Sequence, residues 1–154
     1  MSEDAEPVPA PWVLDVSVLA EVARGDTRTM MMIQELDARG RPLIIPALAV
    51  TGASLDMRSE EAAELLEGLE RLEKAIMAPL RDAEQVVRLA AVVARTGLDP
   101  WDAHAAAVAD ASVCPILTFD APKWRQHSRD LDDQLHIIEI ADPGQRPETL
   151  ASPC

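Results

Sequence analysis

Cysteine, positive charge and long apolar runs are scarce in this sequence, and each shortage excludes a class of protein. The two cysteines are Cys114, inside an apolar segment, and Cys154, the last residue. Neither their number nor their spacing indicates a disulfide framework or a zinc site. No apolar run is long enough to cross a bilayer, and no segment near Met1 resembles a signal peptide. We therefore expect a cytoplasmic protein without a membrane partner.

Positive charge is outweighed by negative charge along most of the chain. The 14 lysines and arginines stand against 27 aspartates and glutamates, which gives a formal net charge of −13 at pH 7. Proteins that hold nucleic acid over a broad surface do so with clusters of lysine and arginine. The composition therefore argues against an extensive RNA-binding surface. Part of the acid excess lies in residues 2–6 and in the glutamates of residues 60–73, where it would solvate exposed positions.

The length of 154 residues fits one domain with a substantial core. Residues 1–11 combine acidic side chains with three prolines, a composition that predicts disorder. Residues 141–154 contain three prolines and a glycine and are predicted to be a tail. We expect the folded domain to occupy residues 12–140.

Segments typical of strands alternate with segments typical of helices throughout this domain. Strands are predicted at residues 12–14, 42–45, 75–79, 113–119 and 135–140. Helices are predicted at residues 17–24, 27–38, 47–57, 60–74, 82–95 and 100–112, followed by a helical turn at 122–128. This alternation predicts a single three-layer α/β domain, in which a central parallel sheet has helices on both faces.

Two of the predicted helices have clear apolar stripes. In residues 60–74, which Ser59 is expected to cap, the stripe comprises Ala63, Leu66, Leu69 and Leu72. In residues 82–95, which Asp82 is expected to cap, it comprises Val86, Val87, Leu89, Ala90 and Val93. Both stripes are predicted to face the core.

The stretch LDPWDAHAAAVADASVCPILTFDAPKW, residues 98–124, places two acids where an α/β fold commonly performs chemistry. Asp99 followed by Pro100 predicts a helix start, which puts Asp102 in the first helical turn. The apolar strand that follows ends at Asp120. The first predicted strand likewise ends at Asp15.

Ligands of open parallel sheets bind beyond the carboxyl ends of the strands. Asp15, Asp102 and Asp120 would meet there if the strands that end at Asp15 and Asp120 are neighbours. Crowded carboxylates repel one another, so such a cluster either shares a proton or binds a divalent cation. Because the ligands are hard oxygens, the cation would be Mg²⁺ or Mn²⁺.

Three short motifs follow one another along the chain: Leu14-Asp15-Val16-Ser17, the segment from Asp102 to Ala109, and Leu117-Thr118-Phe119-Asp120. In this order they resemble the opening motif, the start of the central helix and the closing motif of the PIN domain, the fold of VapC-type toxins and related ribonucleases. The resemblance covers about residues 12–140.

This resemblance implies metal-dependent hydrolysis of RNA phosphodiester bonds. It assigns Asp15 and Asp120 as metal and catalytic ligands, and Asp102 as a ligand directly or through water. Ser17 and Thr118 would hydrogen-bond to these ligands. The family also implies RNA as substrate, an antitoxin-like protein partner and a homodimer.

The chain departs from the family at one acid. PIN nucleases usually carry a glutamate on the helix after the second strand, whereas the matching run here, from Pro46 to Thr51 and Gly52, contains no acid. Asp56, one turn further on, could reach toward the site. With fewer negative ligands a metal ion should bind more weakly. A second interpretation is therefore a catalytically impaired PIN-like module that acts as a binding or regulatory protein.

Purely structural roles remain open as alternatives to the functional roles of these residues. Each of Asp15, Asp102 and Asp120 stands where it could cap a helix. His104 is interpreted as a surface or packing residue, and Trp101 and Trp124 as core residues or as surfaces on which bases stack.

Two other enzyme classes also begin with an acid after the first strand. A haloacid-dehalogenase-like phosphatase needs a second acid where Ser17 stands. A response-regulator receiver needs an acidic pair at the first strand and a late lysine. Lys123 is close to the place of that lysine, but the pair is absent.

Overall fold

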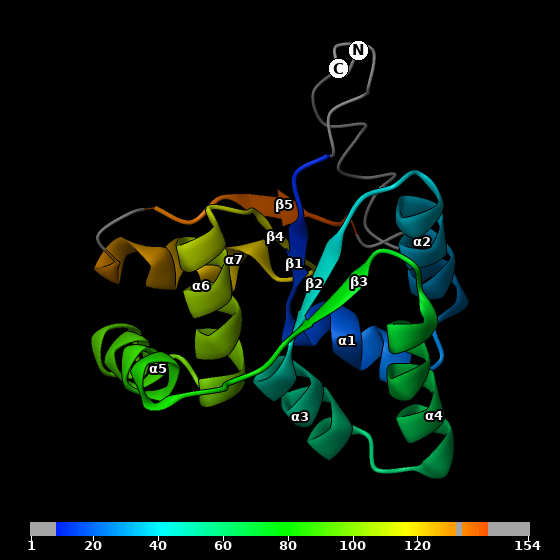
Figure 1. Ribbon diagram of the computed structural model, residues 1–154, viewed down its shortest axis with the longest axis horizontal. Helices are drawn as coiled ribbons and strands as arrows, with labels where there is room; N and C mark the ends of the chain where they lie inside the picture. The colour runs from blue at the N-terminus through cyan, green and yellow to red at the C-terminus, as the bar shows by residue number, and fades with distance from the viewer. Residues whose placement is uncertain (1–8, 132–133, 142–154) are drawn as a thin grey trace.

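The computed structural model describes residues 9–131 and 134–141, and the strands in these ranges form one parallel sheet. The strands are β1 (Trp12–Leu14), β2 (Leu43–Pro46), β3 (Ala75–Ala78), β4 (Ile116–Thr118) and β5 (Ile137–Glu139). They lie in the order β3-β2-β1-β4-β5, and every neighbouring pair is parallel (Figure 1). The prediction of a parallel α/β sheet is confirmed.

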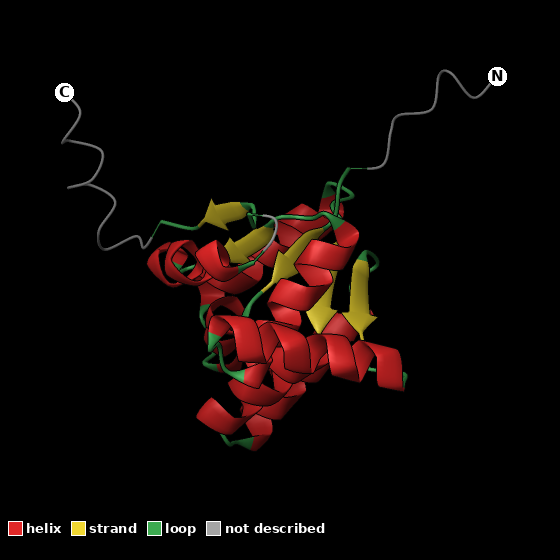
Figure 2. Cartoon of the chain, turned by 90° about the vertical axis from the view of Figure 1, so that its left-hand side faces the viewer, coloured by secondary structure: helices red, strands yellow, loops and turns green. Residues whose placement is uncertain are grey.

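Helices cover both faces of this sheet, which gives the predicted three layers (Figures 1 and 2). The helices are α1 (Val16–Ala23), α2 (Thr27–Ala38), α3 (Ala47–Asp56), α4 (Glu60–Gly68), α5 (Ala83–Thr96), α6 (Pro100–Ser112) and α7 (Ala121–His127). Short 3-10 turns η2 (Leu69–Arg71) and η3 (Ser128–Asp130) follow α4 and α7. In Figure 1, α1, α2 and α4 lie on one side of the sheet and α5, α6 and α7 on the other. None of the helices in the described ranges is long and apolar enough to cross a membrane.

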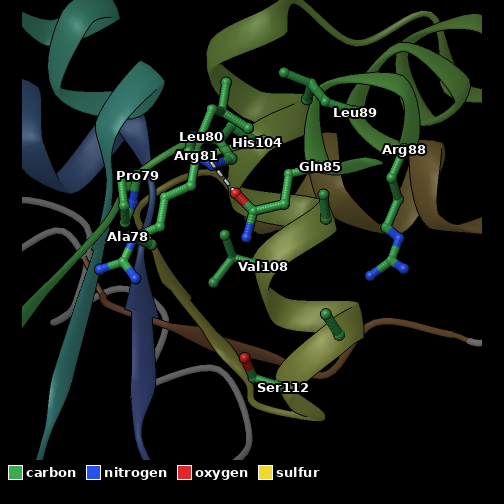
Figure 3. A pocket seen from close by; sticks show the side chains of 12 residues that line it. Ala78, Pro79, Leu80, Arg81, Gln85, Arg88, Leu89, His104, Val108 and Ser112 are labelled. Carbon is green, nitrogen blue, oxygen red and sulfur yellow. Dashed lines mark hydrogen bonds between the residues drawn. The ribbon is translucent and has the colours of Figure 1, made fainter. Parts of the chain in front are cut away.

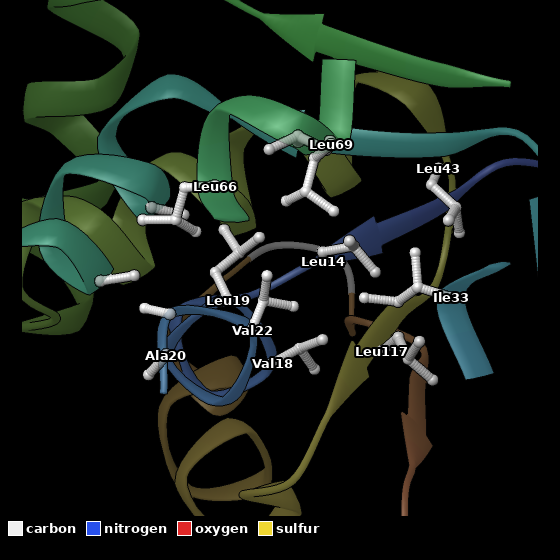
Figure 4. Packing of buried hydrophobic residues seen from close by; sticks show 14 of the residues in the cluster. Leu14, Val18, Leu19, Ala20, Val22, Ile33, Leu43, Leu66, Leu69 and Leu117 are labelled. Atoms are coloured by element: carbon white, nitrogen blue, oxygen red, sulfur yellow. The ribbon is translucent and has the colours of Figure 1, made fainter. Parts of the chain in front are cut away.

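Two apolar clusters hold these layers together, because side chains alternate between the faces of each strand. Leu14 belongs to the cluster under α1 and α4, shown in Figure 4, together with Leu43 and Leu117. Its neighbour Val13 belongs to the cluster under α6, together with Ile116. The sheet is therefore buried on both faces, as the continuous apolar strands predicted.

The strand order changes direction at β1, and this change positions the candidate site. From β1 the chain proceeds outward to β2 and β3, and then returns to place β4 on the opposite side of β1. Val13 pairs with Ile116 and Leu14 with Leu117. Asp15 and Thr118 therefore lie side by side at the carboxyl edge, in the crevice where open α/β sheets bind ligands.

The helix predicted over residues 60–74 is shorter than expected. It ends at Gly68, and the chain continues as the 3-10 turn η2. Its buried side chains are Ala62 and Leu66, while the predicted Ala63 is exposed. The tighter turn lets the chain reach β3 without an additional helical turn.

Helix α5 and the region before β4 also differ from the expectation. Of the predicted α5 stripe only Leu89 is buried, and Val86 and Val87 are 49% and 67% exposed. The reason is that α5 lies at the edge of the molecule, where it packs mainly on α6. Val113, predicted as the start of a strand, instead ends α6 in a left-handed conformation with φ 53° and is 80% exposed.

The starts of α2 and α6 differ in how they are capped. Asp26 caps α2, because its side chain accepts a hydrogen bond from Thr29 N at 2.9 Å. Asp99 precedes α6 but makes no capping hydrogen bond with its side chain; its backbone carbonyl accepts a hydrogen bond from Ala103 N at 2.8 Å, and the fixed φ of Pro100 favours the helix start. Of the segment 1–11 that is predicted to be disordered, residues 1–8 lie outside the described ranges, and so do residues 142–154 of the predicted tail 141–154.

Candidate functional site

Asp15 lies directly after β1 and is completely buried. Its Oδ1 accepts hydrogen bonds from Ser17 Oγ at 2.6 Å and from Val18 N at 3.1 Å, so it also caps α1. Its Oδ2 accepts a hydrogen bond from Nε1 of the fully buried Trp124 at 2.8 Å. Both carboxylate oxygens are thus bonded to donors of the protein itself.

Ser17 and Thr118 connect Asp15 to the end of β4. The only hydroxyl proton of Ser17 is donated to Asp15, so Thr118 Oγ1, 3.2 Å away, donates to Ser17 Oγ. Ser17 Oγ also accepts from Phe119 N at 2.9 Å, and Thr118 Oγ1 accepts from Asp120 N at 2.8 Å. The two hydroxyls therefore fix the turn after β4 against the turn after β1.

Asp102 lies in the first turn of α6 and is 8% exposed. Its Oδ1 accepts a hydrogen bond from Lys123 Nζ at 3.0 Å. Burial raises the pKa of Asp102 above its usual range; the Lys123 ammonium lowers that pKa, and the Asp15 carboxylate nearby raises it. Asp15 and Asp102 are therefore close enough to interact, and we call this pair the acidic centre.

Asp120, the third predicted site residue, caps a helix. Its Oδ1 accepts a hydrogen bond from Lys123 N at 3.3 Å at the start of α7, and its side chain is exposed. Asp56 points elsewhere as well, since it forms an ion pair with Arg24 at 2.8 Å on the surface. Neither residue has a hydrogen bond that joins its side chain to the acidic centre within the described residues.

The place of the missing family acid is filled by an aromatic ring. A Cβ atom on Gly52 would lie 2.8 Å from Cγ and 2.9 Å from Cβ of Trp101. Such distances are far shorter than ordinary contacts, so no side chain can be added at position 52 unless Trp101 moves. Trp101 directly precedes Asp102, which places this packing next to the acidic centre.

Sequence reasoning missed the bonds of Lys123 and Trp124 to the acids. Both residues follow Asp120 within one turn of α7, and that turn lies at the same edge of the sheet as Asp15 and Asp102. A signal was available, because a lysine and a tryptophan placed after a predicted site acid can reach other acids at that edge. Which acid each one reaches depends on how α7 docks, and a local pattern does not contain that information.

His104 is a buried packing residue, which is one of the two interpretations that the sequence left open. It is 2% exposed, and its Nδ1 accepts a hydrogen bond from Leu48 N at 3.2 Å. Burial lowers its pKa below the usual range. His104 also lines a largely apolar pocket of about 280 Å³ between β3, α5 and α6, together with Leu80, Gln85 and Val108 (Figure 3). No residue of the acidic centre lines this pocket.

With this geometry in place, comparison with known proteins identifies the family. The family model described as "PIN domain" matches residues 11–128, well over half of the chain. The chain belongs to the PIN domain family. The resemblance drawn from the three motifs is thereby confirmed.

Two solved structures share this PIN fold at low sequence identity. One is the crystal structure of DNA-bound VapBC from Salmonella typhimurium, with a TM-score of 0.57, 12% identity, and coverage of 84% of this chain and 98% of the other. The second is the crystal structure of PAE2754 from Pyrobaculum aerophilum, with a TM-score of 0.51, 20% identity, and coverage of 93% and 90%. No curated protein matches the sequence significantly.

The donors of this PIN domain do not fit the divalent cation that the family implies. Throughout the described ranges, no group of three or more aspartate, glutamate, histidine or cysteine side chains could hold a metal ion. Asp15 has its oxygens bonded to Ser17 and Trp124, and Asp102 is paired with Lys123. The metal ligation expected of Asp15, Asp102 and Asp120 stays a prediction, and this arrangement of donors argues against it.

Proposed function

We propose that this chain is a catalytically impaired PIN-fold protein that acts as a binding or regulatory module. The observation that carries the proposal is the bonding of Asp15. Its carboxylate is fully buried, and both oxygens accept hydrogen bonds from the protein, with Trp124 Nε1 on Oδ2. A metal ligand needs a free lone pair aimed at an open coordination position. Two hydrogen bonds on Oδ1 and one on Oδ2 already occupy three of the four lone-pair sites of this buried carboxylate, which leaves little of it for a metal ion.

The charge of the chain supports a protein partner over an RNA partner. The net charge of −13 repels phosphate, and nucleic-acid binding depends on lysine and arginine clusters. The Salmonella structure described above is of VapBC. By this likeness we propose an antitoxin-like protein as the partner class, and the homodimer implied by the family remains a prediction.

RNA hydrolysis is the experiment that tests the proposal. Purified protein is incubated with a panel of structured RNAs in Mg²⁺ or Mn²⁺, beside an active PIN ribonuclease and the Asp15→Asn variant. We expect the natural protein to cleave no faster than Asp15→Asn. Metal-stimulated cleavage that Asp15→Asn and Asp102→Asn both abolish would refute the proposal.

A second experiment tests for the partner. The tagged protein is purified from the cells that encode it, and recovery of the chain alone would refute the binding role.

A second candidate function is the metal-dependent ribonuclease itself, with Mg²⁺ or Mn²⁺ and a VapC-like role. The observation in its favour is the position of Asp15 and Asp102, which interact electrostatically at the point where the strand order changes direction. Ser17 and Thr118 also hydrogen-bond as this function expects of them. The cleavage assay above separates the two candidates directly.

A further inference from the structure

Lys123 places a positive charge inside the acidic centre. Its Nζ lies 3.0 Å from Asp102 Oδ1, and the two side chains are 22% and 11% exposed. The same Nζ lies 5.2 Å from the centroid of the Trp124 ring. The ammonium is thus held between a carboxylate and an aromatic face, and both contacts favour a cation.

A positive charge at this position stabilises the two buried carboxylates. Asp15 is fully buried and Asp102 nearly so, and two carboxylates that interact at low exposure destabilise each other unless a proton or a cation neutralises one of them. A metal-binding PIN centre would be expected to meet this need with a divalent ion. Here a lysine carried on α7 already provides one positive charge without any bound ligand.

Two neighbouring features point in the same direction. Trp124, adjacent to Lys123, donates to Asp15 and occupies one lone pair of its Oδ2. Trp101 packs where a side chain at Gly52 would stand, which excludes the fourth acid of the family. The first feature reduces the number of free lone pairs, and the second reduces the negative charge, that a divalent ion requires. Lys123 offsets part of the negative charge that remains.

We infer that the Lys123 ammonium is the resident cation of the acidic centre, in the role that a divalent metal ion would otherwise have there. The inference rests on the proposed loss of metal-dependent hydrolysis and deepens it. Two expectations follow from the inference. The natural protein has no manganese site, and a variant that lacks the lysine charge gains one.

The chain offers a matched control, because Lys74 and Lys123 are its two lysines and Lys74 is exposed. The natural protein, Lys123→Met and Lys74→Met are titrated with Mn²⁺ at constant ionic strength. Free Mn²⁺ is measured by electron paramagnetic resonance, and the melting temperature is followed by circular dichroism. Lys123→Arg, which keeps the charge, and Lys123→Gln, which removes it but keeps a hydrogen-bond donor, complete the set.

We expect the natural protein, Lys74→Met and Lys123→Arg to bind no Mn²⁺ saturably. Lys123→Met and Lys123→Gln should melt lower without metal and regain roughly 5–10 °C at a hundredfold excess over the dissociation constant. Adding Asp102→Asn to Lys123→Met should abolish that gain.

Two results would overturn the inference. One is saturable Mn²⁺ binding by the natural protein that Asp102→Asn removes. The other is a folded Lys123→Gln or Lys123→Met protein that binds no Mn²⁺. Saturable Mn²⁺ binding by the natural protein would overturn the inference even if both uncharged variants fail to fold. RNA cleavage by the natural protein would refute the proposed function in a separate assay, so the two failures are distinguishable.

Discussion

The hydrogen bond between Trp124 and Asp15 can be tested by replacing the indole with a smaller ring. Trp124→Phe keeps an aromatic side chain in the core but removes the Nε1 donor, which lies 2.8 Å from Asp15 Oδ2. Both residues are completely buried, so no water can replace the donor without entering the core. The variant leaves one oxygen of a buried carboxylate without its partner.

The expected loss follows from two contributions. A hydrogen bond to a charged group contributes about 1.5–3 kcal/mol, and losing it here strands the acceptor. The missing ring volume adds roughly 1 kcal/mol through the small cavity that remains. We therefore expect Trp124→Phe to lower the free energy of unfolding by about 3 kcal/mol, and the melting temperature by about 6–12 °C.

Urea unfolding followed by circular dichroism measures this loss without depending on tryptophan fluorescence. Trp12→Phe is the matched control, because Trp12 is only half-buried and its ring contacts the Arg41 guanidinium at 4.3 Å. It should cost less than about 1 kcal/mol. A double-mutant cycle with Asp15→Asn isolates the pair, for which we expect a coupling of about 1.5–3 kcal/mol.

Additive effects in this cycle would refute the reasoning, as would a Trp124→Phe loss below about 1 kcal/mol. Either result would mean that the indole does not hold the Asp15 carboxylate. The oxygen would then be available to a metal ion, and the main argument for an impaired centre would be lost.

Two further predictions concern residues around the acidic centre. Gly52→Ala should destabilise the fold by about 1–3 kcal/mol because its Cβ would lie 2.8 Å from Trp101, whereas Gly68→Ala, with nothing within 4 Å, should be neutral or slightly stabilising; equal urea midpoints would contradict this. For His104, burial lowers the folded-state pKa below the usual 6.5, so the unfolded chain takes up a proton first as the pH falls. The free energy of unfolding should therefore decrease from pH 6.5 down to the folded-state pKa. His104→Gln should reduce this slope in urea titrations between pH 7.5 and 5, and an unchanged slope would contradict the assignment.

Much of the fold could be predicted because its signals are local. The apolar runs around Val13 and Leu117 identify strands buried on both faces, and Gly97 ends α5 in the left-handed conformation expected of a glycine cap. The features that differ from the prediction depend on the tertiary surroundings of each residue. Val87 belongs to an apolar stripe in sequence, yet α5 lies at the edge of the molecule and leaves it exposed. Periodicity shows that a helix has an apolar face but does not show how much of that face is covered.

The same distinction between local and tertiary information applies to the candidate site. Asp15 and Asp120 were found from their positions at strand ends, and Asp102 from its place in the first turn of a helix. Sequence left open whether Asp120 caps the helix that follows it or binds a ligand, and it could not show that Asp15 and Asp102 have partners from α7. Ser17 and Thr118 lie 101 residues apart in the chain, and they meet only because β4 pairs with β1.

The sequence by itself determined the succession of strands and helices, the acids that end the strands, and the motifs of the PIN family. These depend on patterns within a few residues, where chain geometry allows few alternatives. Only the tertiary structure decided that Trp124 donates to Asp15 and that Lys123 pairs with Asp102. Such contacts join residues 109 and 21 positions apart, and they form only when the docking of α6 and α7 on the sheet brings their donors to the buried carboxylates.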